Sequence, residues 1–444
     1  MDPRLGRLPN SRLCFWGSPP TVRTYADGVP RAYVQAVSES FRTARPDYSD
    51  PVTRSATPGR AIGAVLALLM ATGWAANHFA AVIPVLQETE GLSSTLLDGV
   101  FGIYALGLLP GLFFGGALSD RIGRASVVIP GAAIAALGTF ALLFRHDASG
   151  LFIGRLVIGI GAGLAIGAGT AWAADLRGSA GTVSAGVFLT AGFAVGPLIS
   201  GVVAQFSSQP VILPFVISAA LSVVAIGAAL LWSRTSRTAT SAPTSSEGPR
   251  DTSATAALSW SLPMSLWVFA SVTVGIVTLP ARAPADLEGP LLSGVAAGVT
   301  LITGIVVQAS ARRAAWGPRT GVVGAGIAAI GYVLVAAGGY QPPVWLLVVC
   351  WVVLGAAYGL CLREGLLDLE SFAPQRIRGS LTGVFYVGAY LGFALPVLLV
   401  IIEPSVGVAP PMLVLAALAA AAALGRWRRL VGTGHPRAST LSAQ

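Results

Sequence analysis

Long apolar stretches dominate this chain and recur along most of its length. Six cover Ala61–Leu86, Leu97–Ala117, Ser126–Phe144, Gly150–Ala171, Val183–Gln205 and Val211–Trp232, and six more lie near 261–280, 290–311, 320–338, 343–362, 380–402 and 406–425. Each is close to the roughly 20 residues that a helix needs to cross the hydrocarbon core of a bilayer. The pattern predicts an all-α integral membrane protein with twelve transmembrane helices in two six-helix halves.

The polar segments around these stretches predict the domain boundaries. Residues 1–60 hold many arginines and prolines without a sustained apolar run, and we expect a cytoplasmic disordered extension there. Residues 233–260 are rich in Ser, Thr, Ala and Pro and are expected to form a cytoplasmic linker. The expected bundles are therefore 61–232 and 261–430, followed by a cytoplasmic tail at 431–444.

Composition supports a membrane protein and excludes an ordinary soluble enzyme. Hydrophobic residues make up 54% of the 444 positions and charged residues 11%, whereas a soluble domain carries about 25% charged residues. The net charge of +9 comes with 28 basic residues, all of them arginine. These arginines fall between the apolar stretches, so the expected partner is the lipid bilayer and not a nucleic acid.

Arginine placement also predicts the orientation. One side of the predicted topology receives arginines of the N-terminal segment, the linker, the tail and the loops with Arg121, Arg124, Arg177, Arg312, Arg313, Arg319, Arg376 and Arg378. The other side receives Arg145 and Arg282. Because positive charge favours the cytoplasmic side, we expect a multi-pass plasma-membrane protein with both termini in the cytoplasm.

Two short repeats indicate a duplication of the six-helix unit. Arg177-Gly178-Ser179 recurs as Arg378-Gly379-Ser380, and Gly192-Phe193-Ala194 recurs as Gly392-Phe393-Ala394, at offsets of 201 and 200 residues. Two halves related in this way, with the substrate site between them, are an arrangement found in transporters.

The loop after the second stretch reads Gly116-Ala117-Leu118-Ser119-Asp120-Arg121-Ile122-Gly123-Arg124. Its glycines allow a tight turn, and its charges are those of a cytoplasmic loop, which leaves a simple solvated turn as an alternative. The loop resembles the signature of the major facilitator superfamily, with Ala125 in place of a final basic residue. The resemblance extends over about 61–430 and implies that Gly116, Asp120, Arg121, Gly123 and Arg124 gate the transporter, with Asp120 meeting the start of helix eleven near Gly379 and Ser380.

Ionisable residues inside the predicted spans are the candidates for coupling. Arg155, followed by Gly159, Gly161 and Gly163, resembles a second pattern of the family. A charge at membrane depth is costly unless it faces a cavity or a partner, although Arg155 near a span end could also reach the membrane surface. Histidine as a residue type titrates near neutral pH, so His78 is a candidate for carrying a proton, but a neutral histidine bonded between helices is equally consistent with the sequence. We expect Trp74, Asn77, His78, Arg155 and Tyr358 at the substrate cavity, and no Asp or Glu deep in a span.

The fifth stretch contains Gly192, Gly196, Pro197 and Gly201 and predicts a helix-five hinge. It resembles the glycine-proline motif of drug/proton antiporters, with departures at Ser200 and Val183. Close packing of small residues without any directional meaning is the alternative.

Together these features predict a secondary active transporter that moves a small organic molecule by alternating access, with proton-coupled efflux as the expected mode. An importer or uniporter of a metabolite and a non-transporting receptor remain alternatives. The sequence shows no HExxH, Walker loop or CxxC pair, so we expect no enzyme activity, no metal and no cofactor.

Overall fold

The computed structural model describes residues 58–233, 253–287, 289–374 and 377–433. All of them belong to one compact unit that covers Ala56–Gln444. The expected N-terminal extension up to residue 57, most of the expected linker and the last residues of the tail lie outside the described ranges.

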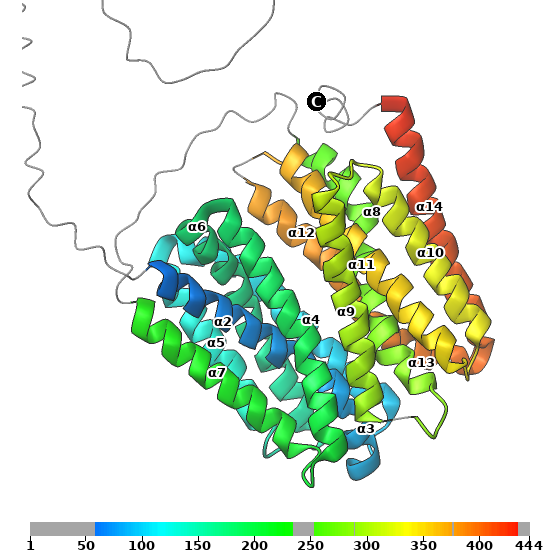
Figure 1. Cartoon of the computed structure of the whole chain (residues 1–444), viewed down its shortest axis with the longest axis horizontal. Helices are drawn as coiled ribbons and strands as arrows, with labels where there is room; N and C mark the ends of the chain where they lie inside the picture. Colours follow the sequence, from blue (N-terminus) through cyan, green and yellow to red (C-terminus); the bar gives the residue numbers. More distant parts are fainter. Residues whose placement is uncertain (1–57, 234–252, 288, 375–376, 434–444) are drawn as a thin grey trace, which may run out of the picture. The chain divides into compact units, whose positions relative to one another are not determined.

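The helices of the N-terminal half follow the predicted stretches. They are α2 (Pro58–Asn77), α3 (Phe79–Glu90), α4 (Ser94–Ile122), α5 (Ala125–Ala141), α6 (Ala148–Phe206) and α7 (Ile212–Ser233) (Figure 1). Span one consists of α2 and α3, which are separated at His78. Spans four and five are both contained in α6, whose backbone leaves the helical conformation at Arg177 and Gly178.

The C-terminal half repeats this plan with more interruptions. Its elements are α8 (Ala254–Thr273), the π-helix η1 (Val274–Thr278), the 3-10 helix η2 (Pro280–Arg282), α9 (Pro290–Arg313), α10 (Thr320–Gly338), α11 (Val344–Phe372), α12 (Arg378–Tyr390), the 3-10 helix η4 (Leu391–Ala394), α13 (Leu395–Val406) and α14 (Ala409–Thr433). Helix α8 begins inside the segment expected to be a linker, because Ser253 caps it by accepting a hydrogen bond from the Ala256 amide at 3.0 Å.

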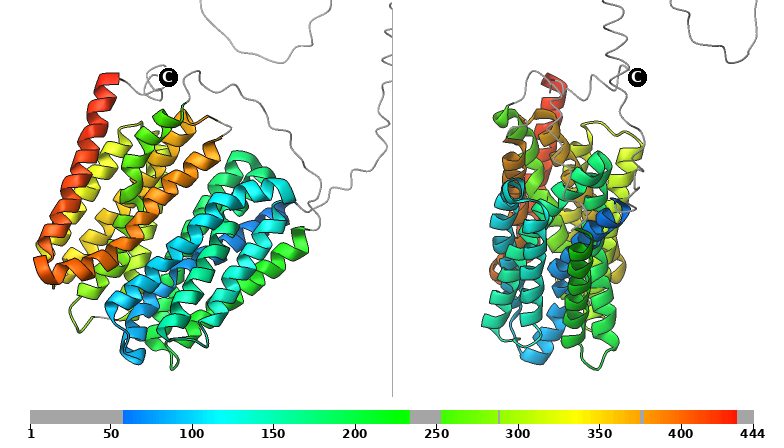
Figure 2. Two further views of the ribbon diagram at one scale, coloured as in Figure 1. Left: turned by 180° about the vertical axis from the view of Figure 1, so that it is seen from behind. Right: turned by 90° about the vertical axis from the view of Figure 1, so that its left-hand side faces the viewer.

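The number of spans agrees with the prediction. Within the described residues, eleven helical segments are long and apolar enough to cross a membrane, and the shorter apolar helix Ala125–Ala141 is the twelfth. The same residues contain no β-strand. The protein is therefore an all-α, multi-pass membrane protein, and Figure 2 shows its helices from two further sides.

The two ends of the helices differ in their arginines. The arginine-rich end is the end of the helices that carries Arg121, Arg124, Arg177, Arg312, Arg313 and Arg378, and the opposite end carries Arg145 and Arg282. Successive spans run between these two ends.

The repeated Gly-Phe-Ala tripeptide makes equivalent contacts in the two halves. In span five, a Cβ added at Gly192 would overlap the carbonyl oxygen of Met70 in span one, and the Phe193 carbonyl accepts a hydrogen bond from Asn77 Nδ2 at 2.9 Å. In span eleven, a Cβ at Gly392 would overlap the backbone of span seven, and the Gly392 carbonyl accepts from Thr273 Oγ1 at 2.9 Å. The first and fifth helices of each half are thus joined by the same small residue and the same kind of polar bond.

The two halves meet closely towards the opposite end. A Cβ at Gly201 of span five would overlap the carbonyl oxygen of Pro290 in α9, and one at Gly294 would lie 2.6 Å from the Pro197 carbonyl oxygen. A Cβ at Gly102 of α4 would lie 3.1 Å from the Phe393 carbonyl oxygen. Backbone therefore lies against backbone across the interface, as the small residues of membrane helices permit.

Candidate functional site

The loop between α4 and α5 holds a charge cluster at the arginine-rich end. Gly123 has a φ of 97°, which glycine adopts without strain, and the turn brings Arg124 back to Asp120. Arg124 also donates to Asp175 Oδ2 and to Ser119 Oγ, both at 2.7 Å. Partial burial lowers the pKa of the Arg124 guanidinium, but Asp175 and Asp120 outweigh this effect and the pKa is raised. The loop is thereby fixed to the end of span four.

Asp120 is not bonded to the other half in this arrangement. Its side chain is 62% exposed and pairs with Arg124, and no hydrogen bond or ion pair joins it to the described residues of α12, whose start near Gly379 and Ser380 is its expected partner. Arg121 is exposed beside it, and a Cβ at Gly116 would meet open space. The gating role of this loop therefore stays a prediction about the other arrangement of the halves.

Arg155 is fully buried in α6 and points into the protein. Its Nη1 donates to the Ala76 carbonyl at 2.7 Å and its Nη2 to the Phe101 carbonyl at 3.3 Å. The guanidinium carbon lies 4.9 Å from the ring of Phe79, 5.8 Å from that of Phe101 and 4.8 Å from that of Tyr104, which favours the cation. The alternative that Arg155 reaches the membrane surface is therefore wrong.

His78 is also fully buried, at the break between α2 and α3. Its Nδ1 donates to the Trp74 carbonyl at 3.1 Å, and its ring packs edge-on against Phe215 at 5.2 Å. His78 Nε2 and Arg155 Nε both lack a hydrogen-bond partner among the described atoms. Because Arg155 bonds Ala76, two residues before His78, the structure brings these two coupling candidates to the same turn of span one.

The remaining span-one candidates pack against span five. Asn77 bonds span five through the Phe193 carbonyl, as described above, so its amide holds two helices together. Trp74 lies against Gly196, where an added Cβ would be 3.0 Å from the tryptophan Cα, and its indole nitrogen has no partner among the described atoms. The glycine stripe of span five therefore packs against span one at Gly192 and Gly196 and against the other half at Gly201.

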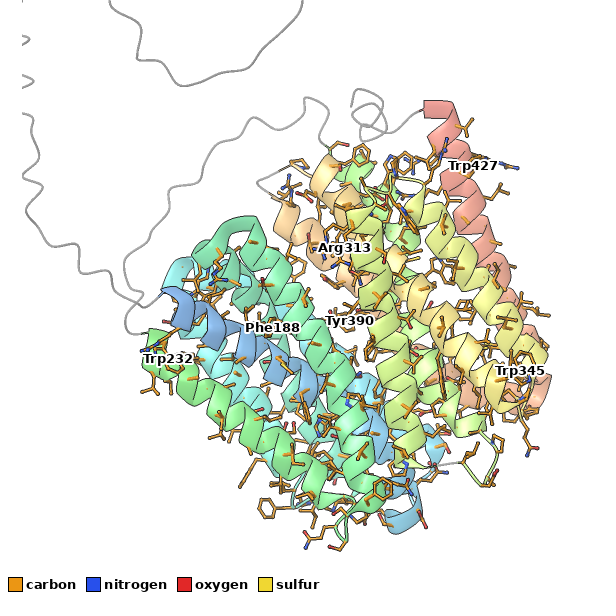
Figure 3. All side chains as sticks on the ribbon, viewed as in Figure 1. Phe188, Trp232, Arg313, Trp345, Tyr390 and Trp427 are labelled. Carbon is orange, nitrogen blue, oxygen red and sulfur yellow. The ribbon has the colours of Figure 1, made fainter. Side chains whose placement is uncertain are left out.

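Aromatic rings from both halves meet in what we call the aromatic junction. It consists of Phe101 and Tyr104 of α4, Phe269 of α8, Tyr358 of α11, Tyr386 and Tyr390 of α12, and Phe393 of η4. Phe101 stacks on Phe393 with ring centroids 5.3 Å apart, and Phe269 lies 4.6 Å from Tyr390. Tyr390 lies where the two halves meet (Figure 3). Tyr104 belongs to the junction and also covers Arg155, so the junction and the buried cation form one continuous site.

Several carboxylates inside the spans correct the expectation that none would be found there. Glu364 and Asp368 are fully buried because α11 continues to Phe372, ten residues beyond the predicted span. Arg426 of α14 donates to Glu364 Oε1 and to Asp368 Oδ2, both at 2.7 Å. We call these three residues the buried triad. Arg426 thereby joins span twelve to span ten, and Arg363 of α11 also pairs with Glu364.

Two more buried carboxylates lie towards the opposite end. Glu403 of α13 pairs with Arg282, and the Tyr340 hydroxyl donates to the Glu403 carbonyl at 3.2 Å. Asp98 lies in the second turn of α4 and is 6% exposed. Sequence could reveal Asp98, as the second residue of a predicted span, but it could not reveal how deeply the other half covers it.

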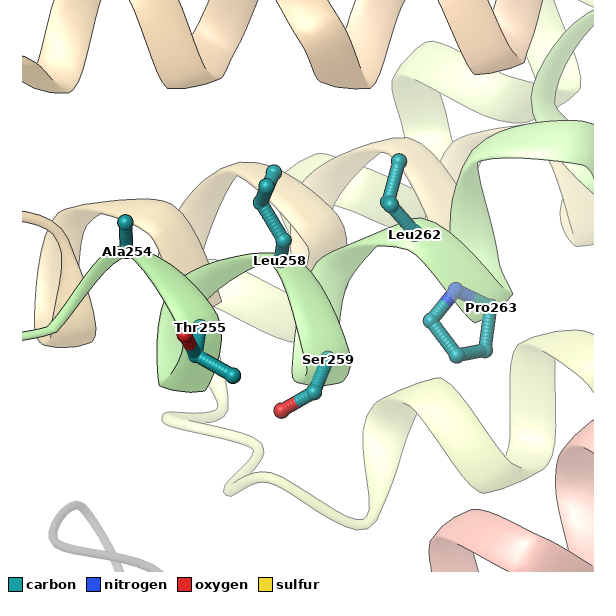
Figure 4. A pocket seen from close by; sticks show the side chains of 6 residues that line it. All are labelled: Ala254, Thr255, Leu258, Ser259, Leu262 and Pro263. Atoms are coloured by element: carbon teal, nitrogen blue, oxygen red, sulfur yellow. The ribbon is translucent and has the colours of Figure 1, made fainter.

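A pocket of about 470 Å³ lies at the start of α8, away from the aromatic junction. Figure 4 shows its lining of Ala254, Thr255, Leu258, Ser259, Leu262 and Pro263, all from this one helix. These residues carry no charge. A group of three or more side chains suited to a metal ion does not occur in the described part of the chain.

Comparison with known proteins identifies the family. A profile of the Major Facilitator Superfamily matches residues 63–397. The chain belongs to the Major Facilitator Superfamily. Its relatives and its fold are those of membrane transporters and not of enzymes, which confirms the family expected from the Gly116–Arg124 loop.

Similar proteins include two that are described as resistance proteins. The chain is 29% identical over 150 residues to the quinolone resistance protein NorA of Staphylococcus aureus (strain Mu50 / ATCC 700699), covering 32% of this chain and 37% of NorA. It is 33% identical over 81 residues to the multidrug resistance protein MdtL of Klebsiella pneumoniae (strain 342), covering 18% of this chain and 21% of MdtL. The matched regions thus span less than half of either relative.

Solved structures show the same fold at low identity. A POT family transporter in complex with 5-aminolevulinic acid superposes with a TM-score of 0.70 at 14% identity, over 83% of this chain and 96% of that chain. The POT family transporter PepTSo superposes with a TM-score of 0.65 at 14% identity, over 83% and 97% of the two chains. At this identity the likeness concerns the fold alone.

Proposed function

We propose that this transporter exports a small organic molecule by alternating access, in exchange for protons. The observation that carries the proposal is the aromatic junction, where rings from four elements of one half meet α4 of the other and continue to the buried Arg155. Flat apolar rings with tyrosine hydroxyls at their edges suit an amphipathic aromatic molecule. A site divided between the halves changes its exposure when the halves rock.

Two further features support export as the direction. The relatives NorA and MdtL are described as resistance proteins. Span five carries the glycine-proline pattern, and its Gly201 packs against the other half at Pro290. This contact gives the pattern a role in closing one end of the transporter.

Arg155 and His78 are the proposed coupling residues, and Asp120 is the proposed gate. Arg155 and His78 each keep one buried nitrogen without a hydrogen-bond partner in the described ranges. The Nε–H of Arg155 can donate to substrate or water, and Nε2 of His78 can accept a proton. We further propose that the arginine-rich end faces the cytoplasm of a cell whose plasma membrane holds the protein, because positive charge favours that side.

Inverted vesicles test the proposal directly. Acidifying the vesicle lumen should drive uptake of a fluorescent quinolone, and Arg155→Ala should reduce that uptake at least about tenfold, equivalent to about 1.4 kcal/mol. Arg145→Ala, an exposed arginine in the loop between α5 and α6, serves as the matched control and should transport normally. Uptake that is indifferent to the pH gradient would contradict proton coupling, and accumulation of substrate by whole cells would contradict export.

A further inference from the structure

Asp98 is a buried carboxylate on the face of α4 that meets the other half. Phe101, three residues later, stacks on Phe393, and Gly102, four residues later, lies against the Phe393 backbone. Residues three and four apart share one face of a helix. Asp98 therefore lies on the same face, one turn nearer the opposite end, and α13 of the C-terminal half is among the elements that pack against α4.

The structure gives this carboxylate no partner. Asp98 is 6% exposed, and neither a hydrogen bond nor an ion pair to it occurs in the described ranges. This differs from Glu364, Asp368 and Glu403, each of which is bonded to an arginine. Asp98 is thus a buried acid without a compensating cation.

Charged groups on the neighbouring elements are engaged elsewhere. On the elements packed against α4, the titratable residues are Glu88 and Glu90 of α3, Arg155, Asp175 and Arg177 of α6, Arg378, Tyr386 and Tyr390 of α12, and Glu403 of α13, while α5 and η4 have none. Arg155 bonds two backbone carbonyls, and Glu403 pairs with Arg282. Glu88 and Glu90 are exposed, and Asp175, Arg177 and Arg378 lie at the arginine-rich end.

An ionised carboxylate without a partner is too costly to bury, and in such a site the acid takes up a proton instead. We propose that Asp98 is a proton-binding site of the opposite end: it holds a proton while the halves are closed there and releases it when they part. The step is balanced, since closing forms one O–H bond with a proton taken from water at that end, and opening returns the proton. The inference rests on the proposed alternation of access and adds a titrating carboxylate to the proposed coupling residues Arg155 and His78.

Spin-label distances across the opposite end test this inference. Labels on Ser208→Cys and Gln341→Cys, exposed positions in the loops after α6 and α10, report whether that end is open. The native Cys14, Cys350 and Cys361 are replaced by alanine. In lipid vesicles, the open-to-closed ratio of the otherwise unchanged protein should rise with pH by up to about tenfold per unit, as release of one proton requires.

Three variants separate the possible outcomes. Asp98→Asn should hold the ratio constant across the pH range and favour the closed state, while Asp98→Glu should restore a pH response and show that the site still folds. Asp286→Asn removes an exposed acid in the loop between η2 and α9 and should leave the response intact. A response that persists in Asp98→Asn, or that disappears in His78→Gln alone, would overturn the proposal.

The same experiment distinguishes this inference from the proposed function. A pH-dependent opening in vesicles that show no proton-driven export would support Asp98 and contradict the export mechanism. If the opposite end opens at no pH, both proposals are wrong.

Discussion

At the scale of single residues, the buried triad shows how this protein accommodates charge inside its helices. Arg426 donates to both carboxylates and to the Trp260 carbonyl at 3.2 Å, and its guanidinium carbon lies 5.2 Å from the Trp260 ring. A buried charge cluster is stable only when its members are paired, so removal of one member is more damaging than removal of all of them.

We therefore expect Arg426→Met to destabilise the protein by about 3–5 kcal/mol, because the buried Glu364 and Asp368 would both lose their bonds to Arg426. Adding Glu364→Gln and Asp368→Asn to the same chain should recover much of this loss. Arg428→Met, two residues away and exposed, is the control. Thermal unfolding in detergent measures all three, and equal melting temperatures for Arg426→Met and Arg428→Met would contradict the role of the triad.

At the scale of the elements, each half is held by a close joint between its first and fifth helices. The joint consists of one glycine against a neighbouring backbone and one side-chain bond to a carbonyl, at Gly192 and Asn77 in one half and at Gly392 and Thr273 in the other. The two glycines stand at matching positions of the repeated tripeptide, and each joint fixes the first helix of its half to the fifth.

Alanine at either joint should destabilise the protein. Gly192→Ala and Gly392→Ala would each drive a methyl group into backbone atoms that have no freedom to rotate away, at a cost of about 1–3 kcal/mol. Gly227→Ala, in α7, would meet nothing within 4 Å and should be neutral. The melting temperatures of the three variants test this expectation. Unchanged melting temperatures for both Gly192→Ala and Gly392→Ala would show that the helices separate more easily than their contacts indicate.

The elements also show what sequence could and could not predict. Apolar runs are long and distinct, so the predicted number and order of the spans were correct, and the loop from Gly116 to Arg124 indicated the family that the profile confirms. The predicted span ended at residue 362 and missed the last ten residues of α11. Glu364 and Asp368 are charged and therefore resemble the start of a loop, unless it is known that Arg426 bonds them. That pairing joins residues about sixty positions apart, and no local pattern contains it.

At the scale of the whole molecule, the loop with Asp120 is fixed within one half while the halves meet towards the opposite end. Arg124 holds Asp175 as well as Asp120, so the loop keeps one anchor when the other is lost. The exposed Asp120 is therefore free to serve an arrangement in which the arginine-rich end is closed.

Asp120→Asn should slow transport at least about tenfold while leaving the melting temperature unchanged. The physical reason is that Asp175 still anchors Arg124 in the described arrangement, so the variant mainly disfavours the arrangement in which Asp120 would meet the other half. A change that disfavours one arrangement by about 1.4 kcal/mol shifts the equilibrium tenfold. Asp175→Asn should instead loosen the loop in both arrangements and lower the melting temperature. Flux assays and thermal unfolding on the same preparations check both expectations, and normal flux in Asp120→Asn would exclude it as a gate.

The contact of Gly201 with Pro290 and Gly294 limits how the halves can move. Main chain touches main chain there, with no intervening side chain to bend or rotate. If span five slid along α9, the backbone carbonyl groups of one helix would collide with the backbone of the other within a fraction of one helical turn. We therefore predict that the two helices move apart, and do not slide along each other, when this end opens.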